Sequence, residues 1–299
     1  MKRSAEDVQE NEVPSKKECS EQEFDKANAS KPLECYHAEL KGERETMEDY
    51  FVIQTDFDIG FATARCALVA LFDGHAGSKC AEYCSKNLVK ILEKHVKNAG
   101  SSFEAVQKGI KKVFVDTFKQ LDDEFLILAR RSNRKLKDGC TATVVLLIDN
   151  VLFCANVGDS KAIVARRKED KCVALSLTVD HTALVFEERQ RIQKAGGFVK
   201  DGRTMGISEL SRAIGDEPLK RHGVISTPSV KKITLTSEDQ ALVVACDGLW
   251  KAFTEEEVLL QLPSEENKET LDKVTSDLAS KAVVKGCGDN VTVLLLSLK

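Results

Sequence analysis

Acidic side chains recur at the ends of apolar runs, and they are the residues of this sequence best suited to chemistry. Five places share the pattern, at Glu48 with Asp49, Asp73, Asp159, Asp247 and Asp289. A carboxylate that ends a buried strand must be hydrated, paired or bound to a metal, because an unpaired charge there is costly. Taken singly, each is most often a turn residue. Together, with few Lys or Arg beside them, they predict oxygen ligands around hard divalent cations, Mg²⁺ or Mn²⁺ rather than zinc.

Such a cluster can hydrolyse a phosphate ester. Two metal ions roughly 4 Å apart can share a water, lower its pKa and neutralise the charge of an in-line displacement. Arg44, four residues before Glu48, has the bidentate donor geometry that suits phosphate oxygens. His75, two residues after Asp73, is the candidate general acid for the leaving oxygen. Close backbone approach is expected at four glycines, Gly74, Gly77, Gly158 and Gly248.

Short β-branched and apolar runs that end in Asp-Gly or Gly-Asp must position these side chains, since strands that end in turns have this texture. The sequence predicts strands over residues 50–55, 66–72, 141–148, 151–156, 161–166, 173–177, 231–235, 241–246 and 290–296. Asp149-Asn150 lies between two of these runs and indicates a hairpin turn. Mostly antiparallel neighbours are therefore expected.

Two long helical patterns separate the second and third predicted strands. Apolar residues recur at the 3.6-residue period over 80–95 and 103–128. Ser101 and Glu104 have capping-box spacing before the second helix, and Thr254 and Glu257 repeat it before a helix over 254–261. Further helices are predicted over 186–195 and 268–284. Strands in two groups with helices on their outer faces indicate a layered sandwich.

Residues 1–37 have few large apolar residues and no periodicity, so we expect a disordered polar tail. Two basic pairs within it, Lys2-Arg3 and Lys16-Lys17, match a bipartite nuclear import signal, although a solvated tail commonly has such pairs as well. Residues 38–299 contain no internal repeat and no linker. They are expected to form one domain.

Composition excludes several classes of protein. The 299 residues are 42% apolar and 31% charged, with a net charge of -4, which argues against a nucleic-acid partner. No apolar run approaches the roughly 18 residues of a membrane span. The ten cysteines include no C-x-x-C pair, and Cys80 and Cys84 fit a buried helix face. A reducing, cytoplasmic location is expected. If the two basic pairs act as a nuclear import signal, the protein is expected in the nucleus as well.

Seven short motifs in a fixed order carry a family resemblance. They are GERETMED (42–49), FDGHAG (72–77), DGCTAT (138–143), ANVGDS (155–160), LSRAIGD (210–216), ACDGLW (245–250) and DNVT (289–292). With them the sequence resembles the metal-dependent type-2C protein Ser/Thr phosphatases over about residues 40–299. Within that family it is most similar to the integrin-linked kinase-associated branch, judged by GERE (42–45), EERQRIQKAGG (187–197) and KRHGV (220–224).

The resemblance implies a four-layer α-β-β-α fold of the α+β class, with two antiparallel sheets between helix pairs and two Mg²⁺ or Mn²⁺ ions at one end. By matching positions, Asp73 would bridge the ions, the Gly74 carbonyl and Glu48 would bind one, and Asp247 and Asp289 would bind the other. Asp49 would lie behind these ligands. Asp159, with Asp247, matches a weaker third metal position in some members.

The same resemblance implies that Arg44 holds the phosphate and that His75 protonates the leaving Ser or Thr oxygen. The reaction would be direct attack by a metal-bridging water, with no phosphoenzyme. His181 and His222 are expected to be structural.

Several positions depart from the family pattern. Ala76 stands where a second Gly usually follows the His, which matters only if that backbone needs a positive φ. Cys140 replaces the usual Ser, Lys161 the usual Arg and Lys251 the usual Asp, none of them at an expected catalytic or metal position. Ser208 and Glu209 fall in a flap-like segment where apolar residues are common, which concerns substrate preference.

The sequence thus predicts a monomeric Mg²⁺/Mn²⁺-dependent protein Ser/Thr phosphatase that acts on phosphorylated proteins. A kinase such as integrin-linked kinase is an expected partner, and no nucleic acid or membrane is. One alternative is a catalytically weak, phosphatase-like adaptor that binds phosphoproteins or a kinase, favoured only by Ala76. Another is a two-metal hydrolase of small phosphoesters.

Overall fold

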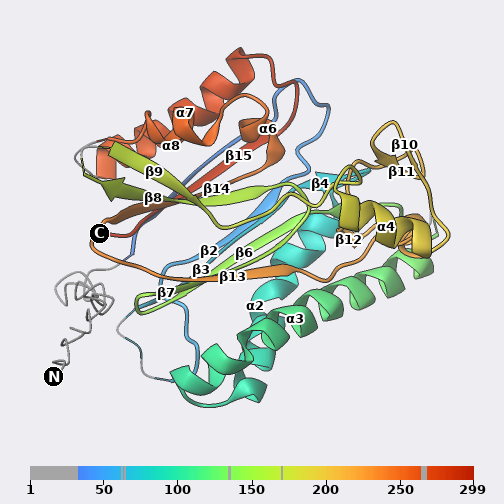
Figure 1. The fold of residues 1–299 in the computed structure, drawn as a ribbon, viewed down its shortest axis with the longest axis horizontal. Coiled ribbons are helices and arrows are strands. Elements are labelled where there is room, and N and C mark those ends of the chain that lie inside the picture. Colours follow the sequence, from blue (N-terminus) through green and yellow to red (C-terminus); the bar gives the residue numbers. More distant parts are fainter. Residues whose placement is uncertain (1–32, 62, 64, 134–135, 170, 264–267) are drawn as a thin grey trace, which may run out of the picture.

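Two stacked sheets lie between two layers of helices (Figure 1) in a computed structural model that describes residues 33–61, 63, 65–133, 136–169, 171–263 and 268–299. The first sheet has the strand order β13-β7-β6-β3-β2 and the second β1-β15-β14-β8-β9, and the pairs within both are antiparallel. The first contains β2 (Tyr50–Gln54), β3 (Cys66–Phe72), β6 (Ala142–Ile148), β7 (Val151–Val157) and β13 (Ser229–Thr234). The second contains β1 (Cys35–Leu40), β8 (Lys161–Lys168), β9 (Lys171–Ser176), β14 (Asp239–Ala245) and β15 (Val291–Ser297).

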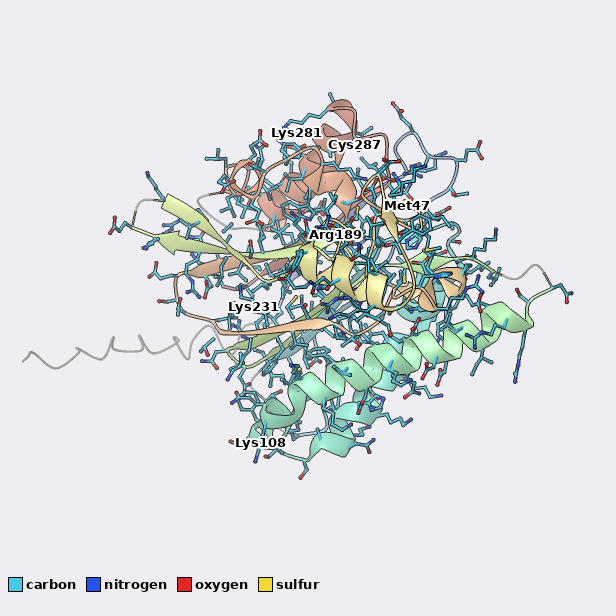
Figure 2. The ribbon with its side chains drawn as sticks, turned by 45° about the vertical axis from the view of Figure 1, so that its right-hand side comes forward. Met47, Lys108, Arg189, Lys231, Lys281 and Cys287 are labelled. Atoms are coloured by element: carbon cyan, nitrogen blue, oxygen red, sulfur yellow. The ribbon has the colours of Figure 1, made fainter. Side chains whose placement is uncertain are left out.

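Helices cover the outer face of each sheet. The first sheet packs against α2 (Lys79–Ala99) and α3 (Phe103–Arg131). The second packs against α6 (Asp247–Trp250), α7 (Glu255–Leu259) and α8 (Lys268–Val284). Lys108 on α3 and Lys281 on α8 lie on the two opposite outer layers (Figure 2). The four-layer α-β-β-α sandwich of the α+β class is therefore confirmed.

Alternating side chains divide the core into three apolar layers, since successive strand residues point to opposite faces. In β3, Leu68 and Ala70 pack with α2 and α3, whereas Val69 lies between the sheets. In β15, Leu295 packs with α8 and Leu294 lies between the sheets. Because both faces are buried, these strands are continuous apolar runs, and this is why the sequence predicts them well.

Short elements gather at one end of the sandwich, on the right in Figure 1. The short strands β4 (Gly74–His75), β5 (Gly139–Cys140) and β12 (Ile214–Gly215) form a small sheet with β5 in the middle. Near them lie α4 (Phe186–Lys194), the β10 (Val199–Lys200) and β11 (Arg203–Thr204) hairpin, and α5 (Glu217–Lys220). Helix α4 confirms the helix predicted over 186–195.

The N-terminal boundary of the fold differs from the sequence prediction. Strand β1 begins at Cys35, and Leu33 and Tyr36 are buried, so the fold begins within the predicted 1–37 tail. Among the described residues, β1 is an edge strand that pairs only with β15, and it lacks the long apolar run that identifies the inner strands. Residues 1–32, which contain both basic pairs, lie outside the described residues.

The helix termini confirm one predicted capping box and correct another. Thr254 and Glu257 form the reciprocal box at α7. At α3 the Oγ of Ser102, not Ser101, accepts a hydrogen bond from the Ala105 N–H at 3.4 Å. Helices α5 and α6 were not predicted, because four residues are too few to show a helical period. In the described ranges no helix is long and apolar enough to cross a membrane.

Candidate active site

A cleft of about 770 Å³ opens at the end of the sandwich where the short elements gather. Acidic residues from the ends of both sheets line it: Glu48 before β2, Asp73 after β3, Asp159 after β7, Asp247 after β14 and Asp289 before β15. Arg44, Gly74 and His75 line the same cleft. The structure thus brings together all the residues for which the sequence predicts catalysis or metal binding, except Asp49, which lies behind the cleft wall.

Three of these carboxylates lie close together. One oxygen each of Asp73, Asp159 and Asp247 lies within 4.8 Å of the others. Burial and the charges of the neighbouring carboxylates raise the pKa of Asp73 well above its usual value. Burial, followed by the charge of Asp247, raises the pKa of Asp159 to about 6. Like charges this close favour protonation unless a cation lies between them.

Asp49 extends the acidic cluster into the interior. Its side chain is only 4% exposed, and its Oδ2 accepts a hydrogen bond from Thr292 Oγ1 at 2.7 Å. Its Oδ1 is buried and has no hydrogen-bond partner within the described residues. Burial raises the pKa of Asp49 to about 6. The Cys246 Sγ lies within 4.8 Å of the Asp49 and Asp73 carboxylates, but the acidic residues that line the cleft offer oxygen donors, which fit hard divalent cations such as Mg²⁺ or Mn²⁺.

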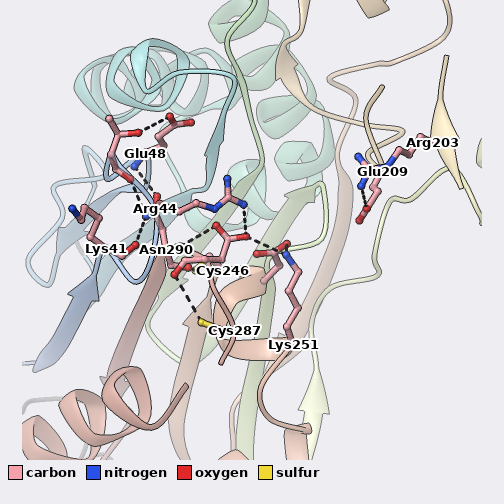
Figure 3. A network of polar contacts seen from close by, with 12 residues as sticks. Lys41, Arg44, Glu48, Arg203, Glu209, Cys246, Lys251, Cys287 and Asn290 are labelled. Atoms are coloured by element: carbon pink, nitrogen blue, oxygen red, sulfur yellow. Dashed lines mark hydrogen bonds and ion pairs between the residues drawn. The ribbon is translucent and has the colours of Figure 1, made fainter. Parts of the chain in front are cut away.

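Glycines allow the chain segments of the site to approach closely. A Cβ on Gly74 would lie 2.4 Å from the Glu48 carbonyl oxygen, and one on Gly248 would lie 2.1 Å from that of Asn290. The Asn290 amide accepts from the Glu48 N–H at 2.8 Å and donates to the carbonyls of Lys41 and Thr46 at 2.8 and 3.0 Å (Figure 3). Asn290 therefore ties the loop that carries Glu48 to the loop that carries Asp289.

Two cations pair with the acidic cluster at its rim (Figure 3). Arg44 Nη2 lies 3.0 Å from Asp289 Oδ2, and its side chain is 59% exposed. Lys251 Nζ lies 2.5 Å from Asp247 Oδ2 and 3.2 Å from Asp289 Oδ2. The sequence places Arg44 here but does not place Lys251. Although Lys251 stands outside the expected metal positions, the structure brings it onto two of the expected metal ligands.

His75 has a partner that the sequence does not predict. Its Nε2 lies 2.9 Å from both carboxylate oxygens of Asp216, which is buried. Burial lowers the pKa of His75, but the charge and hydrogen bond of Asp216, together with the charges of Asp159 and Glu48, outweigh it, so the net pKa is raised. A Cβ on Gly139 would lie 2.5 Å from His75 Nε2, so β5 must have glycine at this point. The only sequence sign of Asp216 is its place at the end of the LSRAIGD motif.

The other residues that the sequence singles out have conformations or contacts that belong to the fold rather than to the acidic cluster. Ala76 has φ 58°, so this position does adopt the conformation that favours glycine. His181 is 3% exposed and bonds Ser229 Oγ at 2.8 Å, and burial lowers its pKa to about 4. His222 Nε2 accepts from Arg221. Cys80 and Cys84 lie on the buried face of α2, as predicted.

The sequence pattern described as "Protein phosphatase 2C" matches residues 34–291. The chain belongs to the protein phosphatase 2C family and is a protein phosphatase. It is 44% identical over 290 residues to an integrin-linked kinase-associated serine/threonine phosphatase 2C of Bos taurus, covering 88% of this chain and 76% of the relative. The Homo sapiens protein of that name is 42% identical over 284 residues, covering 88% and 72%.

Solved structures share the fold. A serine-threonine phosphatase 2C from Toxoplasma gondii superposes with a TM-score of 0.75 at 19% identity, covering 89% of this chain and 95% of that one. A C. elegans sex determining protein superposes with a TM-score of 0.77 at 24% identity, covering 90% and 65%. At these identities the likeness concerns the architecture.

Proposed function

We propose that the protein hydrolyses phosphoserine and phosphothreonine in proteins with two Mg²⁺ or Mn²⁺ ions held in the acidic cleft. The observation that carries this proposal is the convergence of Asp73, Asp159 and Asp247 within 4.8 Å at the meeting ends of two sheets. Asp73 and the Gly74 carbonyl with Glu48 would hold one ion, and Asp73 with Asp247 and Asp289 the other. Asp159 with Asp247 would hold a weaker third.

When bound, the ions would supply a water of lowered pKa as the nucleophile and neutralise charge on the phosphoryl group. Arg44, exposed at the rim and already paired with an acid, would exchange that partner for the phosphate oxygens of the substrate. Asp216 would hold the His75 ring through Nε2 and favour its protonated form. The Nδ1 of His75 is then the nitrogen left to protonate the departing Ser or Thr oxygen.

The partner and the location are proposals of the same kind. The similarity to relatives named for association with integrin-linked kinase supports a kinase partner of that class. We also propose a monomer that acts in the cytoplasm and, if the basic pairs at residues 2–3 and 16–17 act as an import signal, in the nucleus.

The test is phosphate release from a phosphothreonine peptide by the purified protein with Mn²⁺, with EDTA in place of Mn²⁺, and with Asp247→Asn. Release in Mn²⁺ is expected to vanish in EDTA and to fall by at least about a hundredfold in Asp247→Asn, since the metals provide most of the charge stabilisation. Asp123→Asn, on the exposed side of α3, serves as the matched control and should retain full activity. Release from an aryl phosphate but not from the peptide, or none from folded protein in saturating Mn²⁺, would contradict the proposal.

A further inference from the structure

Three cysteines meet behind the active site, and the sequence gives no sign of it because one is far from the others. Cys80 and Cys84 lie one turn apart on α2, and Cys140 lies in β5. The Cys140 Sγ is 3.5 Å from that of Cys80 and 3.8 Å from that of Cys84, and all three lie within 4.8 Å of one another. Each residue is 0% exposed.

We infer that Cys80, Cys84 and Cys140 form a three-sulfur binding site for a trivalent, thiophilic metalloid of the arsenite class. The spacing of the sulfur atoms supports one shared ligand. A tetrahedral ion about 2.3 Å from each sulfur separates the sulfurs by about 3.8 Å, and trivalent arsenic, whose lone pair narrows the angles between its three sulfurs, holds them somewhat closer. The two sulfur–sulfur distances from Cys140, 3.5 and 3.8 Å, are already near this range, and the third lies within 4.8 Å, so binding requires only a modest movement of α2 or β5.

Charge selects the class of ligand. All three thiols are fully buried in apolar surroundings, which favour the uncharged form. Two buried acids act on the cluster, Asp216, which pairs with His75, and Asp122, which pairs with Lys220. Three thiolates around a divalent ion would leave a net negative charge in this apolar, acid-flanked place, which is unfavourable. Three thiolates around a trivalent centre leave none.

The reaction of the three thiols with arsenite also starts from uncharged reactants. Arsenous acid is neutral at neutral pH, and in reaction with three thiols it loses three As–OH bonds, forms three As–S bonds and releases three waters that take up the thiol protons. No electron is transferred.

The three-cysteine site adjoins the small sheet at the end of the sandwich that carries the acidic cleft. Cys140 pairs with Gly74 on one side of β5 and with Ile214 on the other, and α2 begins beside β4 (Figure 1). Cys80 Sγ also donates to the Ile214 carbonyl at 3.4 Å, a bond that the ligand would replace. The neighbouring residue, Gly139, packs against His75 and Asp216. A ligand that links α2 to β5 should therefore stabilise this small sheet.

The test is titration of the reduced protein with arsenite, followed by native mass spectrometry and by the near-ultraviolet absorption of the As–S bonds. The wild type should bind one arsenic with loss of three protons and unfold at a higher temperature. Cys140→Ser, which introduces the residue usual at this position, should weaken binding by at least about tenfold, as changes around a metal site commonly do. Cys80→Ala should do the same.

Cys154→Ser is the matched control, because Cys154 is equally buried but lies in the layer between the sheets. It should bind one arsenic as the wild type does. Unchanged affinity in Cys140→Ser, equal loss in Cys154→Ser, or no stoichiometric binding by the wild type would each overturn the inference. So would stoichiometric Zn²⁺ binding by a protein that does not bind arsenite. All these readouts are independent of phosphatase activity.

Discussion

At the residue level, the pairing of His75 with Asp216 makes a prediction about leaving groups. Asp216→Asn removes the charge that favours protonated His75, so kcat for a phosphothreonine peptide should fall by about a hundredfold. An aryl phosphate needs little help from an acid, because its leaving group is already stable, and should lose much less. His75→Gln should show the same contrast. The measurement is kcat on both substrates for both variants.

The substitution is well suited to this purpose because Asp216 has φ 52°, a conformation that Asn readily adopts. The variant should therefore fold, and its thermal midpoint provides the control. Equal losses on the two substrates would show that Asp216 does not act through proton transfer.

The backbone conformation of Ala76 leads to a second prediction about a single residue, which concerns the stability of the protein. Ala76 has φ 58°, and an L-residue in the left-handed region costs about 1–2 kcal/mol. Glycine would avoid this strain, but its greater freedom in the unfolded chain would cancel part of the gain. Ala76→Gly should therefore stabilise the protein by up to about 1 kcal/mol, or about 2 °C in the thermal midpoint. Phosphate release should be unchanged. A lower midpoint would mean that the loop around Ala76 is not strained.

The single residues of the site differ in how far the sequence reveals them. Carboxylates such as Asp73 and Asp247 follow apolar strands directly, so local order along the chain is enough to suggest them. Besides its i,i+4 pair with Asp247, Lys251 contacts Asp289 on another element, and Asp216 contacts His75, which is far away in the sequence. No periodic or compositional pattern marks such a contact, and only the folded structure makes it visible.

At the scale of elements, the start of α3 offers a test with an adjacent control. Ser102 caps this helix, so Ser102→Ala should cost about 1 kcal/mol in the free energy of unfolding. Ser101→Ala removes the residue that the sequence pattern favours but no cap, and should stay within about 0.5 kcal/mol of the wild type. Denaturant unfolding of both variants makes the comparison. A larger loss in Ser101→Ala would reverse the assignment.

The elements were predictable where packing repeats along the chain. The inner strands and α2, α3 and α8 bury whole faces, so their apolar periods are long. The edge strand β1 and the two-residue strands β4, β5 and β12 are defined by hydrogen bonds to distant partners. Their sequences are too short or too mixed to carry a period, although β4 and β5 shape the cleft.

The architecture of the whole molecule explains why the acids converge. Two sheets stacked face to face bring the ends of β3, β7 and β14 to one end of the sandwich, where each strand is followed by an acidic turn. Apolar burial in three layers holds these turns in place. The fold therefore holds several carboxylates close together although their negative charges repel one another. Bound cations or protons reduce this repulsion.

The repulsion between these carboxylates predicts how the stability of the whole protein depends on pH when metal is removed. The pKa of Asp49 and of Asp159 is raised to about 6 in the folded protein, above the unfolded value. The folded state therefore binds more protons, and the stability that this provides is present at low pH and lost as pH rises through about 6. For Asp49, a rise of about two pKa units corresponds to on the order of 3 kcal/mol.

In EDTA, the difference in thermal midpoint between Asp49→Asn and the wild type should therefore grow in favour of the variant as pH rises from about 5 to about 7.5. Asn keeps the acceptor for Thr292 but carries no charge, whereas Asp123→Asn on the exposed face of α3 should follow the wild type throughout. Mn²⁺ should raise the wild-type midpoint most at the upper end of this range, because it replaces protons that the carboxylates have lost there. Parallel pH profiles for Asp49→Asn and the wild type would mean that the Asp49 charge is compensated within the fold without a metal ion.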